Sequence, residues 1–223
     1  MFPIRDTQPS YTKPVVTIVL IAINVLAFLY ELSLDDWSRN AFIATYGLVP
    51  ETFSWTGLIT STFLHGGWMH LLGNMWFLWI FGDNIEDILG HGKYLLFYLA
   101  CGAAAGLTQA YLTTDPRIPM VGASGAIAGV MGAYLLKFPH SRIYTVVIVI
   151  FFFTTIEVPA WIMLIYWFAT QFFNGVGSIA YSHVSDGGGV AFFAHVGGFI
   201  AGAGLIQVMG PRQPHARRRD LNW

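Results

Sequence analysis

The sequence predicts an all-α membrane protein that crosses the bilayer six times, with both termini in the cytoplasm. Hydrophobic residues make up 55% of the 223 residues and charged residues only 10%, whereas a soluble domain has about 25% charged residues. Uncharged apolar runs recur along the chain, and a transmembrane helix needs about 20 mainly apolar residues. The runs do not alternate in hydrophobicity as the strands of a membrane barrel would.

The six expected spans follow from the apolar runs and the residues that bound them. Pro14 suits the first turn of the first helix, and Gly90 marks the turn after the second. A short, poorly ordered cytoplasmic lead (1–13) precedes a single membrane domain (14–209), and a basic cytoplasmic tail (210–223) follows it. The spans cover residues 14–31, 68–88, 94–112, 122–137, 159–174 and 190–209.

Three segments between the spans differ from them in composition and are not expected to cross the membrane. Residues 31–55 mix acidic and aromatic side chains, which indicates a long outer loop at the membrane surface that could hold a short amphipathic helix. Residues 143–156 are too few to cross comfortably and are rich in β-branched residues, which disfavour helices. We expect them to form an inner-side interfacial hairpin or a re-entrant segment. Residues 174–189 are rich in glycine and are expected to form a loop.

Positive charge tests the topology, because lysine and arginine collect in short cytoplasmic loops. With six spans and the N-terminus inside, only Arg39 and Arg117 fall outside. The basic tail is expected to fix the orientation and to contact anionic lipid rather than nucleic acid. The residues expected inside are Arg5, Lys13, Lys93, Lys137, Arg142, Arg212, Arg217, Arg218 and Arg219.

The sequence predicts neither an intrachain disulfide nor a cleavable signal peptide. Cys101 is the only cysteine, so no intrachain disulfide can form. Lys13 is followed by an apolar run of spanning length without a small-residue cleavage site before Glu31, so no cleavable signal peptide is expected.

Polar residues within the expected spans are few, and each is costly unless it is satisfied. Ser124, His195, His70 and Asn74 stand out, and the six-span topology brings all four to one depth near the outer face. If residues 143–156 crossed the membrane, His195 would lie roughly 20 Å or more from Ser124. This convergence and the charge distribution are independent arguments for six spans.

Glycine spacing predicts that the fourth and sixth spans touch. Small residues four apart let helix backbones approach closely, which would bring His195 within hydrogen-bond reach of Ser124. A serine with an adjacent base can attack a carbonyl group. The fourth span carries a face of Gly125, Gly129 and Gly132. The sixth span carries a face of His195, Gly198 and Gly202.

His70 and Asn74 are four residues apart and share one face of the second span. Asn74 offers amide N–H donors that can stabilise an oxyanion, and the Ser124 backbone N–H is a further candidate. Each residue alone has a structural explanation, since a membrane serine mostly packs and His195 could be an interhelical hydrogen bonder. Their conjunction favours catalysis. His65 and His70 are five apart and lie off one face, so neither a metal site nor a cofactor is expected.

These residues fall in four motifs that resemble the rhomboid family of intramembrane serine proteases, across the whole six-span bacterial-type core. The resemblance implies a Ser124–His195 dyad without an acidic third member, and an oxyanion and substrate-binding site that includes His70, Asn74, Gly122 and the Ser124 N–H. The motifs are Gly122-Ala123-Ser124-Gly125, His70-x-x-x-Asn74, Glu86-x-x-x-Gly90 and Ala194-His195-x-x-Gly198-x-x-x-Gly202.

The resemblance also implies an activity and a location. The expected function is cleavage of transmembrane helices near the outer face, in single-pass or polytopic substrates, within a bacterial inner membrane. Small or helix-breaking residues are expected near the cleaved bond, because an intact helix hides its carbonyl groups. Some family members stack a tyrosine on the base four residues after the nucleophile. This chain has Ala128 there, so another side chain, or none, orients His195.

Two other functions remain open from the sequence. A rhomboid relative without activity could bind and escort membrane helices, although it would normally lack the serine or the histidine. A small transporter could use His70, Asn74 and His195 as a relay. It would show paired broken helices and an internal repeat, and no convincing repeat is present.

Overall fold

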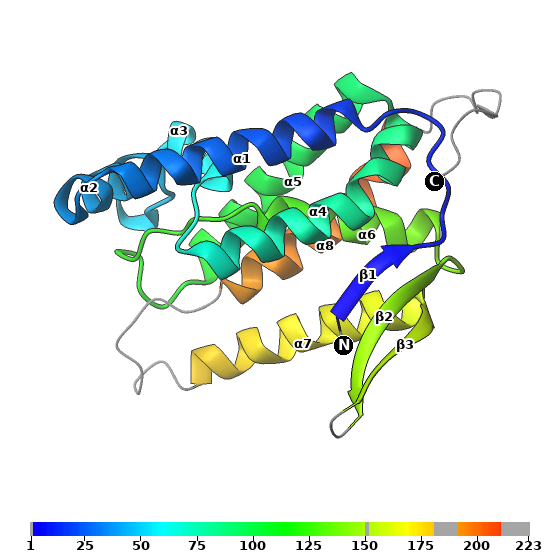
Figure 1. Cartoon of the computed structure of the whole chain (residues 1–223). Coiled ribbons are helices and arrows are strands. Elements are labelled where there is room, and N and C mark those ends of the chain that lie inside the picture. The colour runs from blue at the N-terminus through cyan, green and yellow to red at the C-terminus, as the bar shows by residue number, and fades with distance from the viewer. Residues whose placement is uncertain (1, 150–151, 181–190, 211–223) are drawn as a thin grey trace.

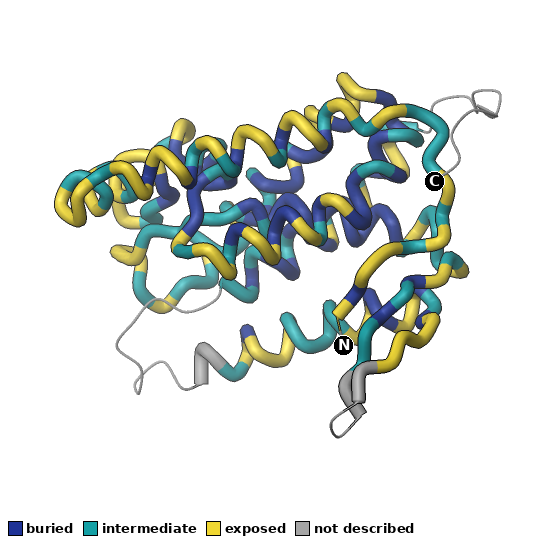
Figure 2. Tube along the Cα trace, viewed as in Figure 1, coloured by how far each residue is buried: buried dark blue, intermediate teal, exposed yellow. Residues whose placement is uncertain are grey.

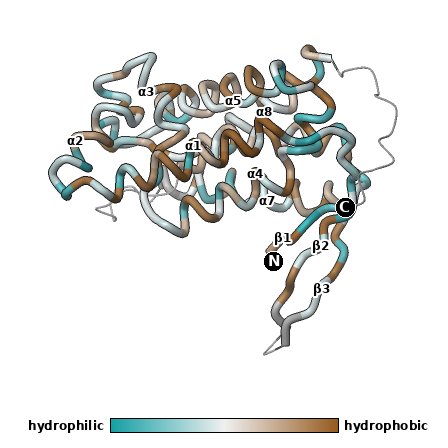
Figure 3. Tube along the Cα trace, turned by 45° about the horizontal axis from the view of Figure 1, so that its top comes forward, coloured by the Kyte–Doolittle hydropathy of each residue, from teal (hydrophilic) through white to brown (hydrophobic). Residues whose placement is uncertain are grey.

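Within the described part of the chain, six helices of 14 residues or more lie in the six ranges in which the sequence predicts membrane spans (Figure 1). The computed structural model describes residues 2–149, 152–180 and 191–210. Among the described residues, three helices (α1, α5 and α8) are long and apolar enough to span a membrane on length and composition alone. Figure 3 shows hydrophobic residues along α1, with hydrophilic residues mainly in the segments at the helix ends. The six helices are α1 (Val15–Ser33), α4 (Trp68–Leu89), α5 (His91–Leu112), α6 (Ser124–Lys137), α7 (Ala160–Ala180) and α8 (Phe192–Met209).

Short helices fill the segment between α1 and α4. Each α-helix there starts at a polar cap, because the side chains of Asp35 and Ser54 accept hydrogen bonds from the backbone N–H groups of Ser38 and Gly57. The predicted outer loop therefore contains helical structure. Its elements are α2 (Asp36–Tyr46), α3 (Trp55–Thr60) and the 3₁₀ turns η1 (Pro50–Thr52) and η2 (Ser61–Phe63).

A three-stranded antiparallel sheet lies beside one end of the helices, so the predicted all-α class is wrong in this respect (Figure 1). Residues 143–149 and 152–156 fall within the antiparallel strands β2 and β3, which confirms that this segment pairs as a hairpin. Its place relative to the membrane stays a prediction. Its valine, isoleucine and threonine residues favour the pleated backbone of a strand. In spatial order the strands are β1 (Phe2–Asp6), β2 (Arg142–Val149) and β3 (Phe152–Pro159).

The prediction of a poorly ordered lead is wrong for Phe2–Asp6, which pairs with β2 as the edge strand β1. Pro3 is tolerated because an edge strand has one side without ladder hydrogen bonds. The Trp76 indole N–H donates to the Pro3 carbonyl at 2.7 Å, and the Tyr134 hydroxyl donates to the Asp6 carboxylate. These partners are far away in the sequence, so the lead itself gives no sign of them.

The helix α7 is longer than predicted, because it continues to Ala180 through residues expected to form a loop. Gly175 lies in this extension and is buried against α8, where an added Cβ would be 3.1 Å from the Phe193 ring. Close packing of this kind can outweigh the weak helix preference of glycine. The remainder of the predicted loop, from residue 181 to 189, lies outside the described residues.

The helix α6 lies at the centre of the bundle. Every residue from Gly125 to Tyr134 is buried (Figure 2), as is typical of a helix that is apolar on all sides. The helices α4, α5 and α8 pack against it. In contrast, α7 packs mainly against α8 and exposes one side, which includes Ile165 and Tyr166.

The glycine faces of α6 and α8 meet backbone to backbone. A Cβ added to Gly198 would lie 2.0 Å from the Gly125 carbonyl oxygen, and a Cβ added to Gly202 would lie 1.9 Å from the Gly129 carbonyl oxygen. Real Cβ atoms essentially never approach within 3.0 Å. Glycine at these positions therefore sets how closely the two helices pack.

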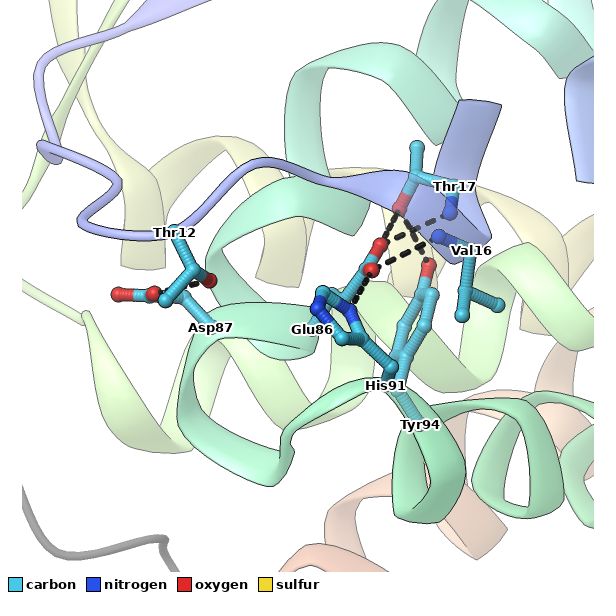
Figure 4. A network of polar contacts seen from close by, with 7 residues as sticks. All are labelled: Thr12, Val16, Thr17, Glu86, Asp87, His91 and Tyr94. Carbon is cyan, nitrogen blue, oxygen red and sulfur yellow. Dashed lines mark hydrogen bonds and ion pairs between the residues drawn. The ribbon is translucent and has the colours of Figure 1, made fainter. Parts of the chain in front are cut away.

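A buried carboxylate joins three helix ends away from the glycine contact (Figure 4). Glu86, near the end of α4, accepts the backbone N–H groups of Val16 and Thr17 at 2.8 Å each, and the Thr17 hydroxyl at 2.7 Å. Its Oε1 also lies 2.6 Å from Nδ1 of His91, the first residue of α5. Because the first N–H groups of a helix have no partner within the helix, Glu86 caps α1 and fixes it beside α4 and α5.

We predict that Gly202→Ala lowers the thermal stability of the detergent-solubilised protein, because the new methyl group meets the Gly129 carbonyl. Overpacking of this kind costs about 1–3 kcal/mol, which lowers Tm by about 2–4 °C per kcal/mol in a chain of this size. Gly204→Ala is the matched control, since a Cβ there meets no atom within 4 Å. Equal Tm values for the two variants would contradict the packing described here.

Candidate active site

The first turns of α4, α6 and α8 meet at one end of the bundle, away from the sheet (Figure 1). Ser124 is the first residue of α6, and His195 lies in the first turn of α8. His70 and Asn74 lie in the first two turns of α4. The N-terminus of a helix carries a partial positive charge, so this end of the bundle favours negative charge that develops there.

Ser124 and His195 are in direct contact. The Ser124 Oγ lies 2.8 Å from the His195 Nε2, which is a hydrogen-bond distance. His195 is only 8% exposed, and Ser124 is half-buried. The contact depends on the glycine faces of α6 and α8, because larger residues there would move the two helices apart. A hydroxyl bonded to an imidazole is the arrangement that activates serine as a nucleophile.

The other side of His195 is held by α7, through two residues that were not among the predicted site residues. Its Nδ1 lies 2.7 Å from the Gln171 Oε1, and its ring centroid lies 5.6 Å from that of Trp167, with the planes tilted by 38°. Ala128 is fully buried within α6. Support for the base therefore comes from α7 rather than from α6. Gln171 could have been found from the sequence, because it is a polar residue within an apolar run and an embedded polar group needs a partner.

Gly122 leaves room beside Ser124 for two side-chain nitrogens. A Cβ added to Gly122 would lie 2.7 Å from the His70 Nε2 and 3.7 Å from the Asn74 Nδ2. Its φ of +128° is also one that L side chains rarely adopt. The Gly122 N–H donates to the Ser61 carbonyl at 2.8 Å, which fixes this segment. His70 and Asn74 therefore face the backbone just before the serine.

Hydrogen bonding indicates where His70 carries its proton. The Gly66 N–H donates to the His70 Nδ1 at 3.4 Å, so the neutral ring carries its hydrogen on Nε2. That nitrogen is the one that faces Gly122. The ring can therefore donate a hydrogen bond toward an oxygen bound beside Ser124.

Asn74 has a partner that the sequence did not reveal. The His65 Nε2 lies 3.0 Å from the Asn74 Nδ2. Burial, and to a smaller extent the neighbouring His70, lower the pKa of His65 to about 4, so its neutral ring accepts one amide N–H. The second N–H of Asn74 remains to donate. His65 precedes α4, so helical spacing could not pair it with Asn74.

The site thus combines a nucleophile type, a base type and convergent hydrogen-bond donors, the set that acyl transfer requires. In the part of the chain that the structure describes, no three histidine, cysteine, aspartate or glutamate side chains are grouped so that they could hold a metal ion.

Fold and site together define a helical membrane protein with a buried serine–histidine pair at one end of its helices. Residues 52–212 match the family model of the Rhomboid domain. The chain belongs to the rhomboid family, and it is an integral membrane protein. The family resemblance seen in the motifs is therefore confirmed.

Several named proteins are similar to this chain. It is 35% identical over 128 residues to Rhomboid protease GluP of Bacillus subtilis (strain 168), covering 55% of this chain and 24% of that protein. It is 35% identical over 125 residues to Putative rhomboid protease YdcA of the same strain, covering 55% and 61%. With Rhomboid protein 1, mitochondrial, of Saccharomyces cerevisiae it shares 29% identity over 190 residues, covering 82% and 50%. The chain thus matches less than two thirds of the length of each.

We predict that Gly122→Ala slows the reaction of the protein with a fluorophosphonate probe by roughly 100-fold, the loss typical of a disrupted oxyanion site. The added methyl group strains the backbone and meets the His70 ring. Gly92→Ala is the control, because a Cβ at Gly92 meets no atom within 4 Å. A labelling rate equal to that of the control would show that the space at Gly122 has no part in the reaction.

Proposed function

We propose that the protein is an intramembrane serine endopeptidase that cleaves transmembrane helices of other membrane proteins. Ser124 is the nucleophile and His195 is the general base. The observation that carries the proposal is the 2.8 Å contact between the Ser124 Oγ and the His195 Nε2. Two similar proteins, Rhomboid protease GluP and Putative rhomboid protease YdcA, are named as proteases, which supports a hydrolase.

In the acylation step, the His195 Nε2 takes the proton of the Ser124 hydroxyl while the Oγ attacks the carbonyl carbon of the substrate peptide. Negative charge develops on the carbonyl oxygen. The His70 Nε2–H, the free Asn74 N–H and the Ser124 backbone N–H stabilise it. The His195 imidazolium then gives its proton to the leaving amine, the C–N bond breaks, and an ester with Ser124 remains.

Deacylation reverses the roles of the same groups. His195 removes a proton from a water molecule, and the hydroxide attacks the ester carbon. The C–O bond to Ser124 breaks, the serine regains a proton from His195, and a carboxylate product leaves. No metal ion or cofactor takes part in either step.

The topology we propose has six crossings, with the lead (1–13) and the tail (210–223) in the cytoplasm around a membrane domain (14–209). The site then lies near the outer face. The length of α6 supports this depth, since 14 residues extend only about 21 Å, against about 30 Å for the hydrocarbon core. A helix this short can begin below the outer surface, where water from outside reaches Ser124.

The proposed substrates are single-pass or polytopic membrane proteins that carry small or helix-breaking residues near the cleaved bond. A helix must open locally before its carbonyl groups can reach Ser124, because they are bonded within the helix. The membrane we propose is the bacterial inner membrane. Similar proteins include bacterial and mitochondrial ones.

We predict that a fluorophosphonate probe labels the purified protein in detergent, and that Ser124→Ala and His195→Ala each abolish labelling, because the probe needs an activated serine. Ser33→Ala is the control, since Ser33 lies at an exposed end of α1 and bonds only to a nearby carbonyl. In proteoliposomes, the parent protein but not Ser124→Ala should cleave a single-pass helix with a glycine–alanine pair near its outer end.

Labelling that survives Ser124→Ala would refute the assignment of the nucleophile. A protein that binds such helices without labelling or cleavage would instead be a helix-binding relative. Transport of a solute that depends on His70 and His195, without labelling, would favour the transporter.

A further inference from the structure

The Gln171 side chain on α7 has two hydrogen-bonded neighbours, and together they determine how it faces His195. Its Oε1 lies 2.7 Å from the His195 Nδ1, the ring nitrogen away from Ser124. Its Nε2 lies 3.3 Å from the Oγ1 of Thr170, which in turn lies 2.7 Å from the Trp167 carbonyl oxygen. Four hydrogen bonds in series thus connect the Trp167 carbonyl to the Ser124 hydroxyl.

The Trp167 carbonyl, at the start of this series, determines which group donates and which accepts in every following hydrogen bond. A backbone carbonyl can only accept, so the Thr170 hydroxyl gives its single hydrogen to the Trp167 oxygen. The Thr170 Oγ1 can then only accept, so it receives a hydrogen from the Gln171 Nε2. The amide of Gln171 is thereby oriented with its oxygen toward His195.

The same reasoning fixes the proton of the base. The Gln171 Oε1 can only accept, so the His195 Nδ1 must carry a hydrogen. The neutral ring then has a bare Nε2, which is free to accept the Ser124 hydroxyl hydrogen at 2.8 Å. The opposite tautomer would leave the Gln171 oxygen facing a bare nitrogen and the Ser124 hydroxyl facing an N–H.

We propose that Thr170 and Gln171 are positioning residues that hold His195 in the tautomer able to take the Ser124 proton. The role of this tautomer in catalysis rests on the proposed function. The tautomer itself follows from the hydrogen bonds and does not depend on activity. The Gln171 oxygen also remains bonded to Nδ1–H when His195 becomes protonated, and it stabilises the imidazolium. A neutral amide does this without placing a second charge in an apolar region, where an unpaired charge is costly.

The kinetic test uses the rate of fluorophosphonate labelling. Gln171→Leu should lower the rate roughly 10- to 100-fold, as is typical when a group that orients a functional histidine is lost. Thr170→Val should lower it roughly threefold to tenfold, the value of one hydrogen bond, whereas Thr170→Ser keeps the hydroxyl and should retain the parent rate. Gln207→Leu, an exposed position three turns further along α8, is the matched control.

The pH dependence of the labelling rate shows whether Gln171 positions His195 or only fills space beside it. In Gln171→Glu a carboxylate faces Nδ1 and favours the protonated ring, so the acid limb of the rate profile should move to higher pH by roughly one unit. A profile that does not move, together with a parent rate in Gln171→Leu, would overturn the proposal.

The tautomer can also be read without any activity. In protein with ¹⁵N-labelled histidine, the His195 signals are identified by their loss in His195→Ala. We expect Nδ1 to be protonated and Nε2 bare at neutral pH, and Gln171→Leu to give a mixture. A parent protein with its proton on Nε2 would overturn the proposal, whereas failure of Ser124→Ala to abolish labelling would overturn only the proposed function.

Discussion

The backbone contact between α6 and α8 is the constraint on which the rest of the site depends. Packed helices are usually 8–10 Å apart, and the Ser124 and His195 side chains are too short to meet if bulkier residues separate the helices. Glycines on both faces remove that limit, with Gly198 against the Gly125 carbonyl and Gly202 against the Gly129 carbonyl. Helices in lipid gain little from the hydrophobic effect and depend on close packing. The same contact therefore stabilises the bundle and forms the serine–histidine pair.

Charged side chains lie at both ends of the bundle. One end holds Glu86 with its hydrogen-bonded partners, and Lys93, which donates to the Met209 carbonyl at 3.0 Å; the other holds the buried Glu31, which accepts the His65 backbone N–H at 3.1 Å. The side chains described around Ser124 are instead the imidazoles of His195 and His70 and the amides of Gln171 and Asn74. This arrangement fits a reaction in which charge appears only transiently. It also explains how His195 is oriented by Gln171 and not by a carboxylate, whose burial would be costly.

Features with a repeating local pattern could be predicted from the sequence, and features that depend on distant partners could not. Long apolar runs mark the six helices, and glycine spacing marks the faces on which α6 and α8 touch. The strand β1 has no such signature, because its partners Tyr134 and Trp76 are on other elements. His65 could not be predicted as the partner of Asn74, because it precedes α4 and so has no helical spacing relative to Asn74. Gln171 was missed because one polar residue in an apolar run shows no periodicity.

We propose that Ser124, His195 and the donors beside Gly122 form a single reaction site. The most direct measurement is a crystal structure of the protein after it has reacted with a fluorophosphonate. We expect a phosphorus–oxygen bond to the Ser124 Oγ, with the phosphoryl oxygen facing Gly122 within hydrogen-bond distance of the His70 Nε2 and the Asn74 Nδ2. An adduct on another residue, or a phosphoryl oxygen directed away from these donors, would show that these groups do not form one site.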